Sequence, residues 1–264
     1  MSRFIRFFIL IQVLFLLSCT SDGERSTSLV NVFLTVSPVE AEDVVLELLG
    51  VDVQTSDVRG QGNNIPRFLP NLEAVKEINV NGLIAGRQYL LGRGEFTQGA
   101  ITSLQLRLGN ANRLKSGGAE FRVVNRENTP FEVSIPLTTG ISHDVIIELD
   151  LQQSLFNDDI ISSGNIILNP KLRAFSTLET GVITGTVSPT PQRAYVFALQ
   201  GRDTLAITAS DPASGRFDLR GLRGTYDILV RSLNPAFPQD TIGQVIVSPM
   251  QRVNLGNINL NPNP

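Results

Sequence analysis

The 264-residue chain contains one cysteine, one histidine and no tryptophan. These counts exclude an intramolecular disulfide framework, a Cys/His zinc site and any catalytic centre that needs two histidines. Charged residues make up 18% of the chain and hydrophobic residues 42%, which excludes a wholly disordered or collagen-like protein. The formal net charge of −3 provides no basic footprint, so we expect no nucleic-acid partner.

The first 18 residues have the pattern of a secretory signal peptide. Arg3 and Arg6 precede an apolar run at residues 7–17, in which Gln12 is the one polar break. Eleven helical residues span about 16 Å, which is roughly half of the hydrocarbon core of a bilayer. This length is too short for a transmembrane helix and is typical of a signal-peptide core. We therefore expect residues 1–18 to be a cleaved signal peptide.

The only cysteine of the chain follows this run directly. Residues 16–19 are Leu-Leu-Ser-Cys, which resembles the lipobox of bacterial lipoproteins: a branched apolar residue, a small residue at −1, then cysteine. The resemblance implies cleavage before Cys19, a diacylglyceryl group on its thiol and acylation of its new amine. The alternative is an ordinary secretory signal with a coincidental cysteine. Because acyl chains such as palmitate gain about 0.8 kcal/mol per buried CH₂, they would hold the protein on a membrane without a spanning helix.

The segment after the cleavage site is small and polar. Residues 19–28 have the composition of a flexible tether that carries the lipid. Well-studied Gram-negative lipoproteins that stay in the inner membrane typically have Asp after the lipidated cysteine, whereas this chain has Thr20. The resemblance therefore implies the cell envelope, and its outer membrane, with the periplasmic and surface faces both open. Cleavage removes 18 of the 264 residues and leaves a mature chain of 246.

The mature chain repeatedly alternates apolar and polar residues, which is the pattern of strands with one buried face. The clearest alternating runs are at residues 30–36, 104–108, 131–137, 145–151 and 226–230. Turn signals separate the runs, and the best helical candidate is residues 70–78, where Leu72, Val75 and Ile78 have helical spacing. The pattern predicts an all-β protein with two antiparallel β-sandwich-like domains.

The second predicted domain, residues 181–261, restarts a complete strand pattern. Its glycine, leucine and aromatic signature consists of Gly215, Phe217, Leu219, Gly221, Gly224 and Tyr226. The first glycine would turn the chain into a strand that buries Phe217 and Leu219, and the other two would permit a tight connection to a buried Tyr226. This signature resembles the carboxypeptidase regulatory-like domain, a small transthyretin-like β-sandwich. The resemblance implies a fold and leaves the function open.

The first predicted domain, residues 29–180, carries four segments of a second signature. They are VFLTVSP at 32–38, LQLRLGN at 104–110, VIIELDLQQSL at 145–155 and ILNPKLR at 167–173. In this order they resemble domain-of-unknown-function family 4382, which is found in bacterial lipoproteins. That family often has Asp at both carboxylate positions of the third segment, where this chain has Glu148 and Asp150. No activity is established for the family, so the resemblance implies no reaction.

The acidic residues are the first candidates for chemistry. Glu148 and Asp150 would share one strand face at roughly 6.5–7 Å, within the range of carboxyl separations in glycosidases. A solvated outer face is the plainer interpretation, and a cation or sugar-hydroxyl contact is the functional one. Asp158 and Asp159 offer oxygen ligands for Ca²⁺, although an ordinary Asn/Asp turn also explains them.

The remaining candidates are one histidine and one charged strand face. The sequence neighbours of His143 would point to the opposite strand face, so no Ser-His-Asp triad forms there, and we expect His143 at a strand edge or in a turn. Arg216, Asp218 and Arg220 would share one face of a strand. A solvated face of mixed charge is the plain interpretation, and contact with a small anion or polysaccharide is the sharper one.

Three functions remain after these exclusions. The first is a membrane-anchored cell-envelope lipoprotein with a non-catalytic binding or structural role and no cofactor besides the lipid on Cys19. The second is a carbohydrate-binding accessory lipoprotein, whose partner would be a polysaccharide; an envelope protein is the alternative partner. The third is a hydrolase that uses Glu148, Asp150 or the Asp158–Asp159 pair. The lack of tryptophan disfavours strong sugar stacking, and the poverty of catalytic residue types favours a protein that is not an enzyme.

Overall fold

The computed structural model describes residues 27–61, 65–126, 129–157 and 164–261. Strands make up most of these residues, and helix is limited to two single turns, η1 (Val80–Gly82) and α2 (Leu151–Ser154). The all-β prediction is therefore confirmed. In the part of the chain described, no helix has the length and apolar character that crossing a membrane requires.

The predicted helix at residues 70–78 is wrong. This segment is an irregular connection that ends in β4 (Glu77–Asn79), a short strand paired with β2 (Asp43–Asp57). Leu72 and Val75 are 84% and 65% exposed. Their helical spacing thus has no core to face, and packing rather than periodicity decides whether a short amphipathic segment becomes a helix.

The N-terminal unit, which comprises the described residues from 27 to 176, has two sheets over one core. The smaller sheet has the order β13-β10-β1-β5, and the larger has the order β11-β12-β8-β7-β2-β6-β9 with β3 and β4 also paired to β2. The strands of the smaller sheet are β1 (Thr27–Val36), β5 (Tyr89–Thr97), β10 (Ser142–Leu149) and β13 (Leu172–Ser176). The others are β3 (Arg67–Pro70), β6 (Gly99–Leu108), β7 (Arg113–Ser116), β8 (Ala119–Asn125), β9 (Phe131–Leu137), β11 (Leu155–Asn157) and β12 (Ile166–Leu168).

The core of this unit follows from strand alternation. Val30, Val32 and Leu34 of β1 are fully buried, and they pack with buried residues of both sheets, including Leu104 and Leu106 of β6. Most strand pairs are antiparallel, as the sequence predicts, but β1 pairs with β10 and β8 with β12 in parallel. Alternation shows which face is buried and not which way a neighbouring strand runs, so strand direction depends on the path of the chain.

The C-terminal unit, residues 181–260, has its own two sheets. Their orders are β17-β14-β20 and β16-β15-β18-β19, and β14 pairs with β20 in parallel. The strands of the first sheet are β14 (Gly181–Ser188), β17 (Arg216–Leu222) and β20 (Arg252–Asn259). Those of the second are β15 (Ala194–Gln200), β16 (Asp203–Ala209), β18 (Gly224–Ser232) and β19 (Asp240–Val247).

The glycine and aromatic signature of this unit behaves as the sequence predicts. Phe217 and Leu219 are each 1% exposed, and Tyr226 is 6% exposed. The hydroxyl of Tyr226 donates to the carbonyl of Arg223 at 2.8 Å. Gly215 has φ +71°, and a Cβ there would lie 2.2 Å from the carbonyl oxygen of Val187, so this position requires glycine.

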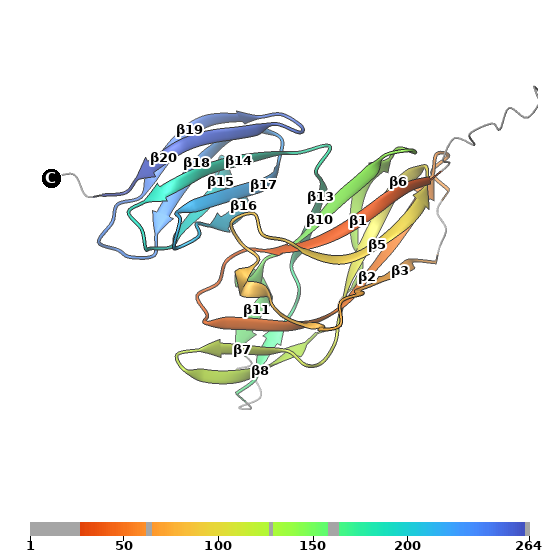
Figure 1. Cartoon of the computed structure of the whole chain (residues 1–264), viewed down its shortest axis with the longest axis horizontal. Helices are drawn as coiled ribbons and strands as arrows, with labels where there is room; N and C mark the ends of the chain where they lie inside the picture. The colour runs from red at the N-terminus through yellow and green to blue at the C-terminus, as the bar shows by residue number, and fades with distance from the viewer. Residues whose placement is uncertain (1–26, 62–64, 127–128, 158–163, 262–264) are drawn as a thin grey trace, which may run out of the picture.

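The two units lie at opposite ends of the long axis, as Figure 1 shows with the red-to-green and the blue strands. Strands up to Ser176 pair only within the first two sheets, and strands from Gly181 pair only within the other two. The units nevertheless share apolar contacts, because Tyr195, Ile207 and Ala209 pack into the core of the N-terminal unit.

Candidate functional site

Glu148, the first acidic candidate, is buried at the joint between the two units. It lies in β10, is 8% exposed, and its Oε2 accepts a hydrogen bond from Arg173 Nη2 at 2.7 Å. The register of β10 and β13 places these two residues opposite one another. Burial raises the pKa of Glu148, and the attraction of Arg173 offsets part of that rise. The plain interpretation of a solvated outer face is therefore wrong for Glu148, because the C-terminal unit covers this side of the sheet.

Asp150, its predicted partner, lies just beyond the strand and caps α2. Its Oδ1 accepts from the backbone nitrogen of Gln153 at 3.1 Å and from the hydroxyl of Ser37 at 3.0 Å. Its Oδ2 accepts from the side-chain amide of Gln153 at 2.9 Å. This is the arrangement of a helix N-cap, in which the carboxylate satisfies a backbone donor that the helix leaves unpaired.

A cavity of about 260 Å³ lies between Glu148, Asp150, Lys171, Arg173 and the β16 residues 204–207. Two basic groups there balance two acidic ones. Both carboxylates accept hydrogen bonds from protein groups, Glu148 through Oε2 and Asp150 through both of its oxygens.

Arg173 was not identified from the sequence, and it connects the two units. Its Nη2 also donates to the carbonyl of Arg220 at 3.0 Å, and its guanidinium carbon lies 5.0 Å from the ring centroid of Phe175. A Cβ on Gly221 would lie 2.5 Å from that ring, so the C-terminal backbone packs directly against Phe175. The single sign in the sequence was the position of Arg173 in the last segment of the family signature.

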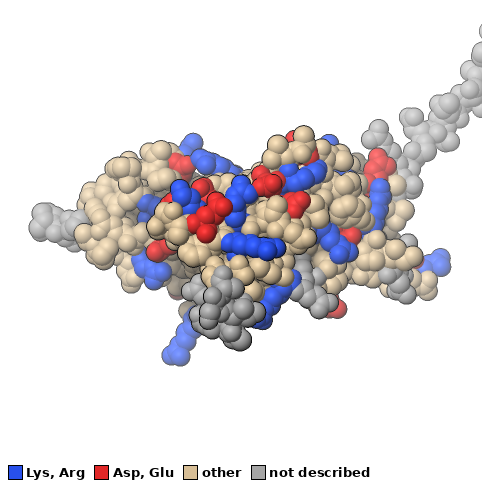
Figure 2. All heavy atoms as spheres, turned by 90° about the horizontal axis from the view of Figure 1, so that it is seen from below, with Lys and Arg blue, Asp and Glu red and all other residues tan. Residues whose placement is uncertain are grey.

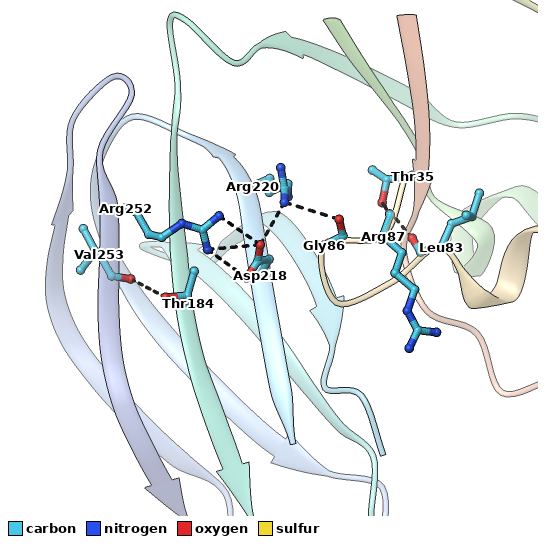
Figure 3. A network of polar contacts seen from close by, with 9 residues as sticks. All are labelled: Thr35, Leu83, Gly86, Arg87, Thr184, Asp218, Arg220, Arg252 and Val253. Carbon is cyan, nitrogen blue, oxygen red and sulfur yellow. Dashed lines mark hydrogen bonds and ion pairs between the residues drawn. The ribbon is translucent and has the colours of Figure 1, made fainter. Parts of the chain in front are cut away.

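A second polar contact joins the units at the loop between η1 and β5 (Figure 3). Arg220 donates to the carbonyl of Gly86 at 3.4 Å and to Asp218 at 2.9 Å, and Arg252 also approaches Asp218, at 3.3 Å. Nearby, Arg87 pairs with Asp211 at 2.7 Å. The prediction that Arg216, Asp218 and Arg220 share a strand face is confirmed by the alternation with buried Phe217 and Leu219.

His143 lies at the second position of β10 and is 2% exposed. Its Nε2 is 3.0 Å from the backbone nitrogen and 3.1 Å from the carbonyl oxygen of Thr138. His143 thus lies near the end of a strand, beside the turn that leads into β10, and its ring is buried there. Among the described residues, no three His, Cys, Asp or Glu side chains gather as metal ligands.

Three predicted site residues, Cys19, Asp158 and Asp159, lie outside the described residues. The face of the molecule in Figure 2 carries basic and acidic side chains beside one another rather than a large patch of one sign. This agrees with the near-balanced composition of 22 basic and 25 acidic residues.

Comparison with known proteins identifies the N-terminal unit. The model of the family described as domain of unknown function (DUF4382) matches residues 27–170, more than half of the chain. The chain belongs to the DUF4382 family. The resemblance drawn from the four sequence segments is thereby confirmed for this region. No curated protein matches the DUF4382 chain.

Two solved structures show weak similarity to this DUF4382 protein. The Bacillus anthracis TIE protein is 9% identical with a TM-score of 0.26, and the match covers 88% of this chain and 33% of that one. The fimbrial anchor protein Mfa2 from Porphyromonas gingivalis is 13% identical with a TM-score of 0.18, and the match covers 78% of this chain and 81% of that one. This chain thus spans about a third of the TIE chain that it matches.

Proposed function

We propose that this DUF4382 protein is a lipoprotein of the cell envelope, anchored in the outer membrane by lipid on Cys19, with a non-catalytic binding or structural role. The observation that carries the proposal is the Leu-Leu-Ser-Cys motif at residues 16–19, directly after a charged and apolar leader. Two or three long acyl chains are sufficient for stable attachment to a membrane.

The arrangement of the units is compatible with an anchor at this end. The eight peptide steps from Cys19 to Thr27 reach at most about 28 Å. The start of β1 and the C-terminal strand β20 lie at opposite ends of the long axis (Figure 1). The N-terminal unit would therefore stay near the membrane, and the C-terminal unit would extend away from it toward a partner.

The use of the charged residues supports a role without catalysis. Glu148 accepts a hydrogen bond from Arg173 at the joint between the units, and Asp150 is the N-cap of α2. Both members of the predicted carboxylate pair therefore have structural roles. Of the alternatives, a carbohydrate-binding accessory role is favoured over a hydrolase by the polar, open sheet face around Arg216 and Asp218. A Ca²⁺ contact at Asp158 and Asp159 stays a prediction.

The anchor is tested by replacing the cysteine in the full chain expressed in a Gram-negative host. Cys19→Ala should abolish incorporation of radiolabelled palmitate and should move the protein out of the carbonate-washed membrane fraction or stop its maturation. Ser21→Ala, which alters the tether and keeps the cysteine, serves as the matched control and should behave as the native chain. Unchanged labelling and fractionation in Cys19→Ala would overturn the proposed anchor.

A further inference from the structure

The outer face of the β17-β14-β20 sheet forms a polar hollow of about 470 Å³. Alternation along the strands buries Phe217, Leu219 and Ile183 on the inner face and turns their neighbours outward. The strand register then aligns the outward residues in rows, with Asp218 opposite Thr184 and Thr184 opposite Asn254. Arg216 lies opposite Thr186 in the next row.

The N-terminal unit supplies one wall of this hollow. Ala85, in the loop between η1 and β5, lines it and has φ +53°. Its neighbour Gly86 has φ +86°, and a Cβ there would lie 2.7 Å from Asp218 Oδ2, so the loop backbone packs against the sheet. Arg220 donates a hydrogen bond to the Gly86 carbonyl, which connects this loop to the sheet (Figure 3). The hollow is therefore built from both units.

The charges around the hollow do not cancel. Arg216 and Arg252 line the hollow with Asp218, its one lining carboxylate, and Arg220 pairs with Asp218 from beside it. Asp218 is shared between Arg220 at 2.9 Å and the 57% exposed Arg252 at 3.3 Å. Arg216 is exposed, and no carboxylate in the described ranges lies within ion-pair distance of it. The site therefore has guanidinium groups available to an added anion.

We propose that this hollow binds an acidic saccharide, with its carboxylate or phosphate on Arg216 and Arg252. Thr184, Thr186 and Asn254 line the same hollow and supply neutral donors and acceptors to hydroxyl groups. The carboxylate of Asp218 would repel a bare anion but accepts hydrogen bonds from sugar hydroxyls, so the mixture suits a polyhydroxylated ligand with an acid group better than an inorganic ion. The volume is within the usual range of small-molecule sites, about 300–1,000 Å³.

This inference rests on the binding role proposed above and gives it a ligand class. The test uses the full chain purified in detergent and titrated calorimetrically with trisaccharides of galacturonate, glucuronate and mannuronate and with a glucose phosphate. The neutral counterpart of each sugar and inorganic phosphate are the comparison probes. At least one acidic saccharide should bind at least tenfold more tightly than its neutral counterpart, and added salt should weaken that binding by screening.

Variants then locate the binding. Arg216→Gln and Arg252→Gln replace the charged guanidinium with a shorter, neutral amide, and each should weaken binding roughly tenfold, the order of one charge-assisted hydrogen bond. Arg202→Gln, in the exposed turn between β15 and β16, is the matched control and should leave binding unchanged. Thr186→Val should weaken binding of the acidic saccharide roughly fivefold and leave any binding of phosphate unaltered.

Three outcomes would overturn the proposal: no acidic saccharide binds, neutral and acidic probes bind equally, or both arginine variants bind as the native chain. Binding of phosphate with equal affinity to the saccharides, insensitive to Thr186→Val, would also refute a saccharide site. These results are independent of palmitate labelling, so a failed ligand class and a failed membrane anchor give different observations.

Discussion

Removing the two partners of the buried Glu148–Arg173 pair should have unequal effects on stability. Arg173→Gln leaves the carboxylate of Glu148, which is 8% exposed, without its cationic partner. An uncompensated buried charge of this kind costs about 3–5 kcal/mol. The same substitution removes the hydrogen bond to the Arg220 carbonyl, which connects the units. We therefore expect Arg173→Gln to be strongly destabilising.

Glu148→Gln should cost about 1 kcal/mol or less, because it removes the charge whose burial is unfavourable. Arg173 then keeps the carbonyl oxygens of Arg220 and Gly221 as acceptors, and its side chain is 30% exposed to water. The double variant should recover most of the stability lost in Arg173→Gln. Recovery by a second substitution distinguishes an unpaired charge from a simple loss of packing.

The pH dependence follows from the raised pKa of Glu148. In the unfolded chain this carboxyl titrates near its ordinary value of 4.5, and in the folded chain it titrates higher because it is buried. The folded state therefore binds more protons between the two values, and stability falls as the pH rises through that window. Without the attraction of Arg173 the window extends upward, so Arg173→Gln should be less destabilised at pH 5 than at pH 7.

The measurement is urea unfolding, followed by circular dichroism at pH 5 and pH 7, of the native chain, both single variants and the double variant. Arg113→Gln is the control, because it breaks an ion pair with Glu77 in which both side chains are more than two-fifths exposed, and it should hardly change the midpoint. Equal losses in Glu148→Gln and Arg173→Gln would refute the reasoning, as would a loss in Arg173→Gln, relative to the native chain, that is larger at pH 5 than at pH 7.

Two further predictions concern the joint and a turn of the C-terminal unit. Gly221→Ala should lower the urea midpoint more than Gly201→Ala, since both glycines have positive φ but only a Cβ at Gly221 would meet the ring of Phe175, at 2.5 Å. The backbone strain alone is about 1–2 kcal/mol in each, and equal midpoints would contradict direct packing of the units. The pKa of Asp211 is lowered below its ordinary value of 3.8, chiefly by hydrogen bonds from Ser214. The charged Asp211 carboxylate should therefore stabilise the folded state above pH 3.8, and this stabilisation should disappear as the pH falls through the lower pKa of the folded state. Acid unfolding of Asp211→Asn should lack this component, and an unchanged acid transition would show that the turn does not depend on the charge.

The strands and the inner face of each were accessible from the sequence because they depend on local periodicity. Val30, Val32 and Leu34 alternate in the sequence and are fully buried in β1, and Phe217 and Leu219 do the same in β17. The family segments likewise identified the region that belongs to DUF4382. The helix expected at residues 70–78 failed because the same periodic pattern found no core to pack against.

The candidate site could be predicted only in part. The sequence identified Glu148, Asp150 and the Arg216–Asp218–Arg220 face, but each was judged by its own strand alone. The partner of Glu148 is 25 residues away, and Gly86, in the wall of the polar hollow, is 134 residues from Arg220. The alternation of apolar and polar residues along one strand carries no information about contacts between residues so far apart in the sequence. The outer face of a strand therefore has the same sequence pattern whether water or another unit covers it.

Sequence alone therefore determined the all-β class and the family of the N-terminal unit, because each depends on residues close together in the chain, and it carries the proposal of lipid on Cys19. Only the tertiary structure decided that Glu148 is buried against Arg173 and that Asp150 caps α2. It also decided that a loop of one unit closes a polar hollow on the other. The physical reason is that burial, and with it the energy of a charge, depends on which distant segment excludes the water.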